Sequence, residues 1–272
     1  MNLKGKNILI TGASRGFGAE LAKNLWEEGA NLFLVARDID WVLMRGDFEP
    51  THDNQSCAKF RVDLSKFGNA EHIKHKFFMY FDKIDALINN AAIQTPIGNS
   101  WEINWDEWNK CMSVNLQAPI KLMRAFVPYM IKQNYGKIIN MSGGGATSSR
   151  PAFSAYATSK TGLVRFSEIL ADEVSEYGVD VNCIAPGAMN TSMQEEVLRS
   201  ENSPDKDIRV AEETLTKTNT MDKPVALVKW LLSEKSDGIT GKLISAVWDD
   251  WKLLEDKTHS KDLYTLRRKD YA

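Results

Sequence analysis

A tyrosine and a lysine four positions apart are the side chains of this sequence best suited to proton transfer. They are Tyr156 and Lys160, in the run YATSK. If this run is helical, residues at that spacing lie on one face, one turn apart. A free tyrosine, with a pKa of about 10, is a poor acid or base at neutral pH. A neighbouring ammonium favours the phenolate and lowers that pKa, so the pair is suited to acid–base chemistry.

A glycine-rich turn near the amino terminus is the second chemical feature. The run TGASRGFG, residues 11–18, follows an apolar stretch and precedes an amphipathic one. Glycines at a strand-to-helix junction permit a tight turn and a close approach of the backbone to a pyrophosphate. The free N–H groups at the positive end of the helix then stabilise the phosphate charge. The turn therefore predicts a nucleotide cofactor.

The elements that must position these residues alternate along the chain. Short β-branched runs are separated by longer amphipathic stretches, which is typical of a parallel sheet covered by helices. The expected strands are residues 7–11, 31–36, 59–62, 86–88, 137–141, 179–185 and 243–247. The clearest helices are residues 17–28, 105–133, with a kink near Pro119 or Pro128, and 154–177. The pattern predicts an α/β fold with a doubly wound parallel sheet of about seven strands.

Two segments depart from this alternation. Residues 38–56 are polar and rich in turn formers, so the second helix should be short or irregular. Residues 188–223 form a long polar insertion, and in an enzyme such a segment is usually a lid. We therefore expect one catalytic domain over residues 1–251, with a lid at about 188–223. Residues 252–272 are expected to form a C-terminal tail that reaches a subunit interface.

The composition excludes several classes of protein. The 272 residues carry a net charge of −2, which argues against nucleic-acid and membrane-surface partners. No apolar run is long enough to span a bilayer, and the amino terminus lacks the features of a signal peptide. The three cysteines, Cys57, Cys111 and Cys183, are too widely spaced for a disulfide framework or a cysteine-based zinc site. A cytoplasmic protein without a metal site is expected.

Further motifs follow in a definite order. NNAA, residues 89–92, comes after the fourth expected strand, Asn115 lies in the long helix, and Pro186-Gly187 follows the sixth strand. Together with the glycine turn and the Tyr–Lys pair, these motifs resemble the short-chain dehydrogenase/reductase family over about residues 5–248. The resemblance implies a single-domain Rossmann-type NAD(P)-dependent oxidoreductase. Such an enzyme acts on a small-molecule substrate and works as a homodimer or homotetramer.

The resemblance also implies residue roles. Tyr156 is the proton donor or acceptor, and Lys160 is its partner and holds the nicotinamide ribose. Asn115 distorts its helix so that its backbone carbonyl, with Lys160, holds a water of a proton relay. The implied cofactor-binding residues are Gly12, Ser14, Arg15, Gly16, Phe17, Gly18, Arg37, Asp63, Leu64, Asn90, Ala91, Ala92, Tyr156, Lys160, Pro186, Gly187 and Met189.

The catalytic serine is where the sequence departs from the family. Relatives carry it thirteen residues before the tyrosine, and this chain has Gly143 there. Ser142 lies one position earlier, and a shift of one residue within a strand reverses the direction of a side chain. Glycines, however, allow the strand to end early and Ser142 to turn into the site. Ser142 is the predicted catalytic hydroxyl; Thr147 or Ser148, or no hydroxyl at all, are the alternatives.

The end of the second expected strand bears on the choice of cofactor. Relatives that prefer NAD carry an acid at the position of Ala36, where it binds the ribose hydroxyls. Here Arg37 follows, and Arg15 of the glycine turn can reach the same place. Two guanidinium groups suit the additional phosphate of NADP. NADP is therefore expected and NAD is less favoured, although Asp38 could turn inward and take the acidic role.

The resulting prediction is an NADP-dependent oxidoreductase that transfers hydride between the nicotinamide and a carbonyl or secondary alcohol. A small polar substrate is expected, because the insertion between residues 190 and 222 has eight acids, four bases and few apolar residues. Tryptophan faces, from Trp101, Trp105, Trp108, Trp248 or Trp251, would hold it in part, although core packing or a subunit contact is the simpler use of these residues. The alternatives are a dehydratase or epimerase that uses the nicotinamide transiently, and a catalytically silent nucleotide-binding sensor or scaffold.

Overall fold

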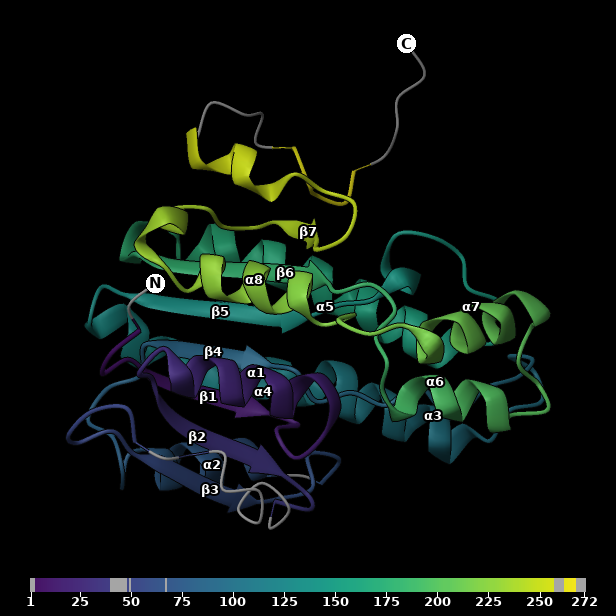
Figure 1. Ribbon diagram of the computed structural model, residues 1–272, viewed down its shortest axis with the longest axis horizontal. Coiled ribbons are helices and arrows are strands. Elements are labelled where there is room, and N and C mark those ends of the chain that lie inside the picture. The colour runs from purple at the N-terminus through teal and green to yellow at the C-terminus, as the bar shows by residue number, and fades with distance from the viewer. Residues whose placement is uncertain (1–2, 40–47, 49, 67, 257–261, 268–272) are drawn as a thin grey trace.

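One parallel sheet of seven strands organises the molecule (Figure 1). The computed structural model describes residues 3–39, 48, 50–66, 68–256 and 262–267. The strands are β1 (Asn7–Thr11), β2 (Asn31–Ala36), β3 (Cys57–Arg61), β4 (Ala86–Asn89), β5 (Gly136–Met141), β6 (Val179–Ala185) and β7 (Leu243–Ser245). Their order, β3-β2-β1-β4-β5-β6-β7, reverses between β1 and β4, and ligands of such sheets bind at this reversal. The predicted doubly wound parallel sheet is confirmed.

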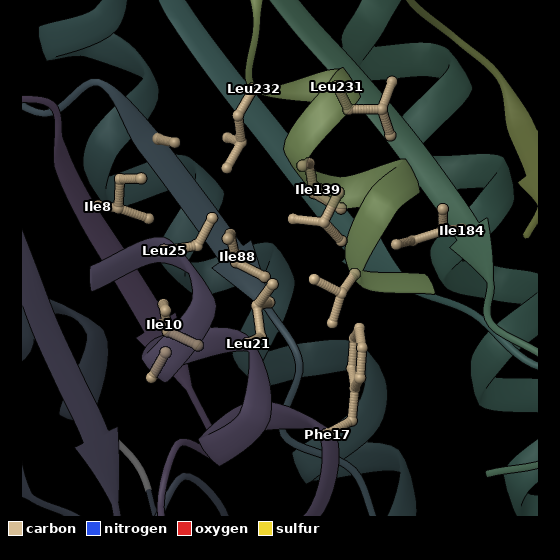
Figure 2. Packing of buried hydrophobic residues seen from close by; sticks show 14 of the residues in the cluster. Ile8, Ile10, Phe17, Leu21, Leu25, Ile88, Ile139, Ile184, Leu231 and Leu232 are labelled. Carbon is tan, nitrogen blue, oxygen red and sulfur yellow. The ribbon is translucent and has the colours of Figure 1, made fainter. Parts of the chain in front are cut away.

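Helices cover both faces of the sheet because successive strand residues point to opposite sides. Helices α1 (Gly16–Glu27) and α8 (Asp222–Leu231) lie on one face, and α2 (Asn69–Phe77), α4 (Ala118–Lys132) and α5 (Ser154–Glu173) on the other. Figure 2 shows the first layer, in which Leu21 of α1 and Leu231 of α8 face strand residues such as Ile88. Each fully buried aliphatic side chain stabilises the fold by about 1.5–3 kcal/mol.

The long helix expected over residues 105–133 is interrupted. It consists of α3 (Trp105–Met112), a π-helical turn (Ser113–Gln117) and α4. The interruption does not fall at either of the two prolines. Pro119 occupies the first turn of α4, where a missing N–H costs nothing, and Pro128 lies inside α4 without ending it. The interruption is instead centred on Asn115, whose side chain bonds outside the helix.

Other boundaries differ by a few residues. β3 begins at Cys57, two residues before the expected start, because Cys57 already pairs with Leu32 of β2. β7 ends at Ser245 instead of residue 247, and α5 ends at Glu173, followed by a short 3₁₀ turn. In the polar segment 38–56, the described residues contain no helix, and residues 40–47 and 49 lie outside the described part.

The polar insertion folds into two helices over the carboxyl end of the sheet, beside α3 (Figure 1). They are α6 (Ser192–Arg199) and α7 (Asp205–Thr216). Val197 of α6 and Ala211 of α7 are fully buried in one cluster with Phe153, which precedes α5. The insertion is therefore packed onto the body through a small apolar face.

The described part of the tail packs against its own chain. A 3₁₀ helix covers Trp251–Asp256, and residues 262–267 lie along α5 and β7. The N–H of Leu243 donates to the Tyr264 carbonyl over 2.6 Å, and the N–H of Leu266 donates to Glu168 over 2.9 Å. A contact with a neighbouring subunit stays a prediction. None of the helices described is long and apolar enough to cross a bilayer.

Candidate active site

A cavity of about 600 Å³ lies at the carboxyl edge of the sheet. Its walls come from the segments that follow β1, β2, β3, β4, β5 and β6, together with α5 and the insertion. Every residue predicted from the sequence to bind the cofactor lines it, and so do Ser142, Tyr156 and Lys160. Of the predicted site residues, Asn115 alone does not line this cavity.

The glycine turn forms one wall and requires glycine for two different reasons. Gly12 and Gly16 have positive φ angles of 67° and 54°, which residues with side chains rarely adopt. Gly18 permits close packing, because a Cβ there would lie 2.2 Å from the Gly12 carbonyl oxygen. The first turn of α1, whose N–H groups have no acceptor within the helix, is thereby held at the cavity wall.

Thr11 and Asn90 fix this turn to the segment after β4. The Thr11 hydroxyl accepts hydrogen bonds from the N–H groups of Asn90 (3.0 Å) and Ala91 (3.1 Å). The Asn90 amide donates to the Thr11 carbonyl over 2.9 Å. The exposed helix N-terminus and the close backbone approach are what a dinucleotide needs, so these residues fit the predicted cofactor.

The residues expected to select NADP lie at one end of the cavity. Arg15, Ala36, Arg37 and Asp38 all line it, and the two arginines and Asp38 are exposed. Burial raises the pKa of Asp63, but hydrogen bonds from Ser65 and the charges of Arg37 and Lys66 outweigh burial and lower it overall. Arg37 therefore lies near the ionised carboxylate of Asp63 as well as near the position predicted for the additional phosphate of NADP.

The first turns of α5 place Tyr156 and Lys160 at the opposite end. Tyr156 is 9% exposed and Lys160 is 1% exposed, and the lysine Nζ lies 5.7 Å from the tyrosine ring centre. The ammonium donates a hydrogen bond of 2.6 Å to the Met141 carbonyl. Burial lowers the pKa of Lys160 to about 8, because a charged group loses solvation there.

The pKa of Tyr156 moves opposite to the expected direction. Burial raises it above its ordinary value, the nearby Arg150 charge opposes this, and Cys111 adds to the rise. Lys160 was expected to lower this pKa, but it is not among the causes of the shift. Desolvation therefore prevails, and the phenol is protonated at neutral pH.

Of the three candidate hydroxyl residues of this loop, Ser142 is the one that lines the cavity. β5 ends at Met141, immediately before it, and the N–H of Ser142 still donates to Ile184 of β6 over 2.8 Å. Ser142 lines the cavity, and its Oγ is buried and has no hydrogen-bond partner among the described residues. The two alternatives, Thr147 and Ser148, are exposed and do not line this cavity.

Gly143, at the position of the family serine, lies against the Tyr156 hydroxyl. A Cβ added to Gly143 would lie 2.3 Å from the Tyr156 hydroxyl oxygen. The phenol therefore occupies space that a side chain at position 143 would need.

Asn115 acts through its side chain on the neighbouring segment. Its amide accepts from the N–H of Ile93 (2.9 Å) and donates to the Ile93 carbonyl (2.7 Å). It also donates to the Ser159 hydroxyl over 3.1 Å. The π-helical turn is thus tied both to the chain after β4 and to α5. The predicted water relay at its backbone carbonyl stays a prediction.

The sequence reasoning missed part of the lining near Tyr156. These residues come from the segment after β4, from α3, from the loop before α5 and from the insertion: Gln94, Thr95, Lys110, Arg150, Met193, Glu196 and Asp207. Arg150, six positions before Tyr156, was the signal available in the sequence. The expected tryptophan faces, from Trp101, Trp105, Trp108, Trp248 or Trp251, are not part of this site, because none of these five residues lines the cavity. Trp105 instead stacks on Trp108, and Trp251 packs on Trp230.

Comparison with known proteins agrees with this fold. The family model described as short chain dehydrogenase matches residues 6–202. The 3-oxoacyl-[acyl-carrier-protein] reductase FabG of Escherichia coli K12 is 31% identical over 193 residues, which are 71% of this chain and 77% of FabG. The oxidoreductase yciK of Escherichia coli superposes with a TM-score of 0.78 at 26% identity, over 90% of this chain and 97% of the other.

A short chain dehydrogenase of Shigella flexneri 2a str. 301, solved in complex with NADP, has the same fold. Its TM-score is 0.76 at 24% identity, over 90% of this chain and 98% of the other. The chain belongs to the short-chain dehydrogenase/reductase family. It is an oxidoreductase of a family that uses a nicotinamide cofactor.

Proposed function

We propose that this protein is an NADP-dependent oxidoreductase that interconverts a carbonyl and a secondary alcohol of a small polar substrate. The observation that carries the proposal is a buried phenol, Tyr156, in one cavity with the glycine turn. A bound nicotinamide would supply or accept the hydride. The chain's own residues have to supply orientation and the proton.

Each residue of the tyrosine end has a distinct task. Tyr156 donates its phenolic proton to the carbonyl oxygen during reduction and takes it back during oxidation. The unpartnered Oγ of Ser142 donates a hydrogen bond to the same oxygen and stabilises the developing charge. Lys160, held by the Met141 carbonyl, orients the ribose hydroxyls of the cofactor.

NADP is favoured by the charges at the end of β2. Ala36 leaves no carboxylate where it would bind the ribose hydroxyls of NAD, and Arg15 and Arg37 line the cavity there. Arginine pairs well with phosphate because its donors match two phosphate oxygens at once. The fold itself accommodates NADP, as in the Shigella flexneri protein.

The remaining proposals concern the setting of the reaction. Residues 188–223 act as a lid, because α6 and α7 supply Met193, Glu196 and Asp207 to the cavity. The protein is proposed to be cytoplasmic, and to work as a homodimer or homotetramer.

Cofactor titration tests the proposed preference. NADPH should bind at least about tenfold more tightly than NADH, a difference of about 1.4 kcal/mol. In an Arg37→Asp variant the preference should narrow or reverse, whereas Arg209→Asp, an exposed change on α7, should leave it unchanged. Equal dissociation constants for the two cofactors in the wild type would refute the assignment.

Turnover tests the role of the tyrosine. Tyr156→Phe should lower kcat by at least about a hundredfold, the usual scale of general acid catalysis, because it removes only the transferable proton. NADPH affinity should stay within about twofold, since the ring remains. A panel of sugars, keto acids, steroids and acyl thioesters tests the alternative. If NADPH binds but is not consumed with any of these compounds, the result favours a catalytically silent nucleotide-binding sensor.

A further inference from the structure

Arg150 is held at the cavity wall with part of its guanidinium unused. It lies in the loop between β5 and α5, and its guanidinium carbon is 3.6 Å from the Phe153 ring centre. Its Nε donates to the Asp207 carboxylate of α7 over 2.9 Å. Its two Nη groups have no hydrogen-bond partner in the part of the chain that the structure describes. The stacked ring and the Nε bond fix the group and leave the Nη donors for a ligand.

The position of this guanidinium relates it to the reaction. Its carbon lies 5.8 Å from the Tyr156 ring centre, and its charge opposes the burial that raises the pKa of Tyr156. Arg150 and Tyr156 line the same cavity. An anionic group bound to the Nη donors would therefore be a few bonds away from a carbonyl placed at the phenol.

The other charged residues near Tyr156 limit the negative charge of a substrate that can bind in the cavity. Lys110 of α3 is a second cation on the wall, while Glu196 and Asp207 are acids on it. Asp207 already engages Arg150 through Nε, so the surplus positive potential is small. One carboxylate can be bound here, whereas a phosphate or a polyanion would be repelled by the two acids.

We propose that Arg150 binds a carboxylate of the substrate, so that the substrates are small monocarboxylic oxo acids and the corresponding hydroxy acids. Guanidinium donors match the two oxygens of a carboxylate in a single plane. This inference rests on the proposed oxidoreductase function. Arg150 acts as a specificity residue, and the proton still comes from Tyr156.

Binding of matched pairs tests the proposal without turnover. The probes are 2-hydroxybutyrate, 3-hydroxybutyrate and 4-hydroxypentanoate, each compared with its amide by calorimetric titration, with and without saturating NADPH. At least one acid should bind about tenfold or more tightly than its amide, and Arg150→Gln should abolish that difference. Arg209→Gln, which removes an exposed arginine of α7, is the matched control and should keep the difference. Equal affinities in all three pairs, or a difference that survives Arg150→Gln, would overturn the proposal.

Two substitutions at Asp207 distinguish a role of Arg150 in substrate binding from a purely structural role in the lid. Asp207→Asn keeps an oxygen that accepts from Nε but removes the competing negative charge, so the acids should bind as tightly as in the wild type or more tightly. Asp207→Ala leaves Arg150 unfixed and should weaken acid binding by about tenfold, with the amides unchanged. If both changes affect acids and amides equally, Arg150 only supports the fold of the lid.

Turnover of the corresponding oxo acids and oxo amides with NADPH distinguishes the two proposals. Acid binding that depends on Arg150 without NADPH consumption would reject the oxidoreductase function and retain the carboxylate site. Equal kcat/KM for oxo acids and their amides would reject the carboxylate site and retain the oxidoreductase function.

Discussion

Ser142 carries a buried hydroxyl oxygen that has no hydrogen-bond partner among the described residues. A buried polar group without a partner costs about 1–3 kcal/mol, so the free protein retains a cost that a substrate oxygen would relieve. Ser142→Ala should therefore lower kcat by about a hundredfold while the free energy of unfolding stays constant or rises. Steady-state kinetics and urea unfolding measure the two effects.

Ser148→Ala is the control for Ser142, since its hydroxyl bonds only to the Gly144 carbonyl and is exposed. It should leave kcat unchanged. A harmless Ser142→Ala together with a harmful Ser148→Ala or Thr147→Val would mean that another loop hydroxyl does the work.

Lys160 predicts the pH dependence of reduction. Burial lowers its pKa to about 8, so the ammonium is present below that pH and lost above it. Tyr156 has a raised pKa and stays protonated in the same range. The kcat/KM for carbonyl reduction should therefore be constant near neutrality and fall as the pH rises through about 8. Because the Lys160 ammonium also binds the cofactor ribose, the affinity for NADPH should fall over the same pH range, and it should do so in the Tyr156→Phe variant as well, which retains Lys160. An NADPH affinity that stays constant up to about pH 10 would contradict this assignment.

At the scale of elements, the π-helical turn depends on Asn115. Its amide satisfies both the N–H and the carbonyl of Ile93 and is completely buried. Asn115→Leu fills the same space but leaves these groups unpaired, so it should lower the free energy of unfolding by about 2 kcal/mol or more. Asn109→Leu, at an exposed position of α3, should change it little. Equal effects in chemical denaturation would show that the bonds to Ile93 are dispensable.

The sequence predicted elements well where the pattern is local. The sequence placed β1, β2, β6 and the glycine turn within a residue or two. Strands of a parallel sheet are buried on both faces, so each one appears in the sequence as a continuous apolar run. The family resemblance placed a distortion of the helix at Asn115, where the π-helical turn lies, whereas the local pattern pointed to the prolines, because the hydrogen bonds of Asn115 reach Ile93, twenty-two positions away.

Long-range pairing explains most of what the sequence did not predict at the site. Arg150 meets Asp207 across 57 positions, and nothing local marks either as a partner of the other. The raised pKa of Tyr156 depends on packing by the insertion and on Cys111, so spacing to Lys160 alone gave the wrong direction. Ser142 lines the cavity, as β5 ends at Met141 immediately before it, and its catalytic role stays a prediction.

At the scale of the whole molecule, we expect the chain to self-associate through an apolar surface on α4 and α5. On these two helices, Met123, Phe126, Met130, Leu163 and Leu170 are buried within the chain. Ile120 and Phe166 are only half-buried, and Ile169 is 49% exposed. Light scattering at micromolar concentration should give a multiple of 30.7 kDa. Ile169→Asp should shift the mass towards one chain, and Leu198→Asp, on α6, should not.

A strict monomer in the wild type, or equal dissociation by Leu198→Asp, would contradict this surface. The described tail, which covers β7 and part of α5 of its own chain, leaves Ile169 exposed. The tail of one chain therefore does not block the surface around Ile169 through which we expect two chains to associate.

The contact between Gly143 and the Tyr156 hydroxyl has a consequence for how this site can evolve. Since a Cβ at position 143 would lie 2.3 Å from the phenol oxygen, a serine fits there only if the backbone or the ring shifts. Positions 143 and 156 should therefore be epistatic: a side chain at position 143 becomes tolerable only after the structure around the tyrosine has changed. If Ser142 supplies the hydroxyl, its loss is not repaired by the single change Gly143→Ser.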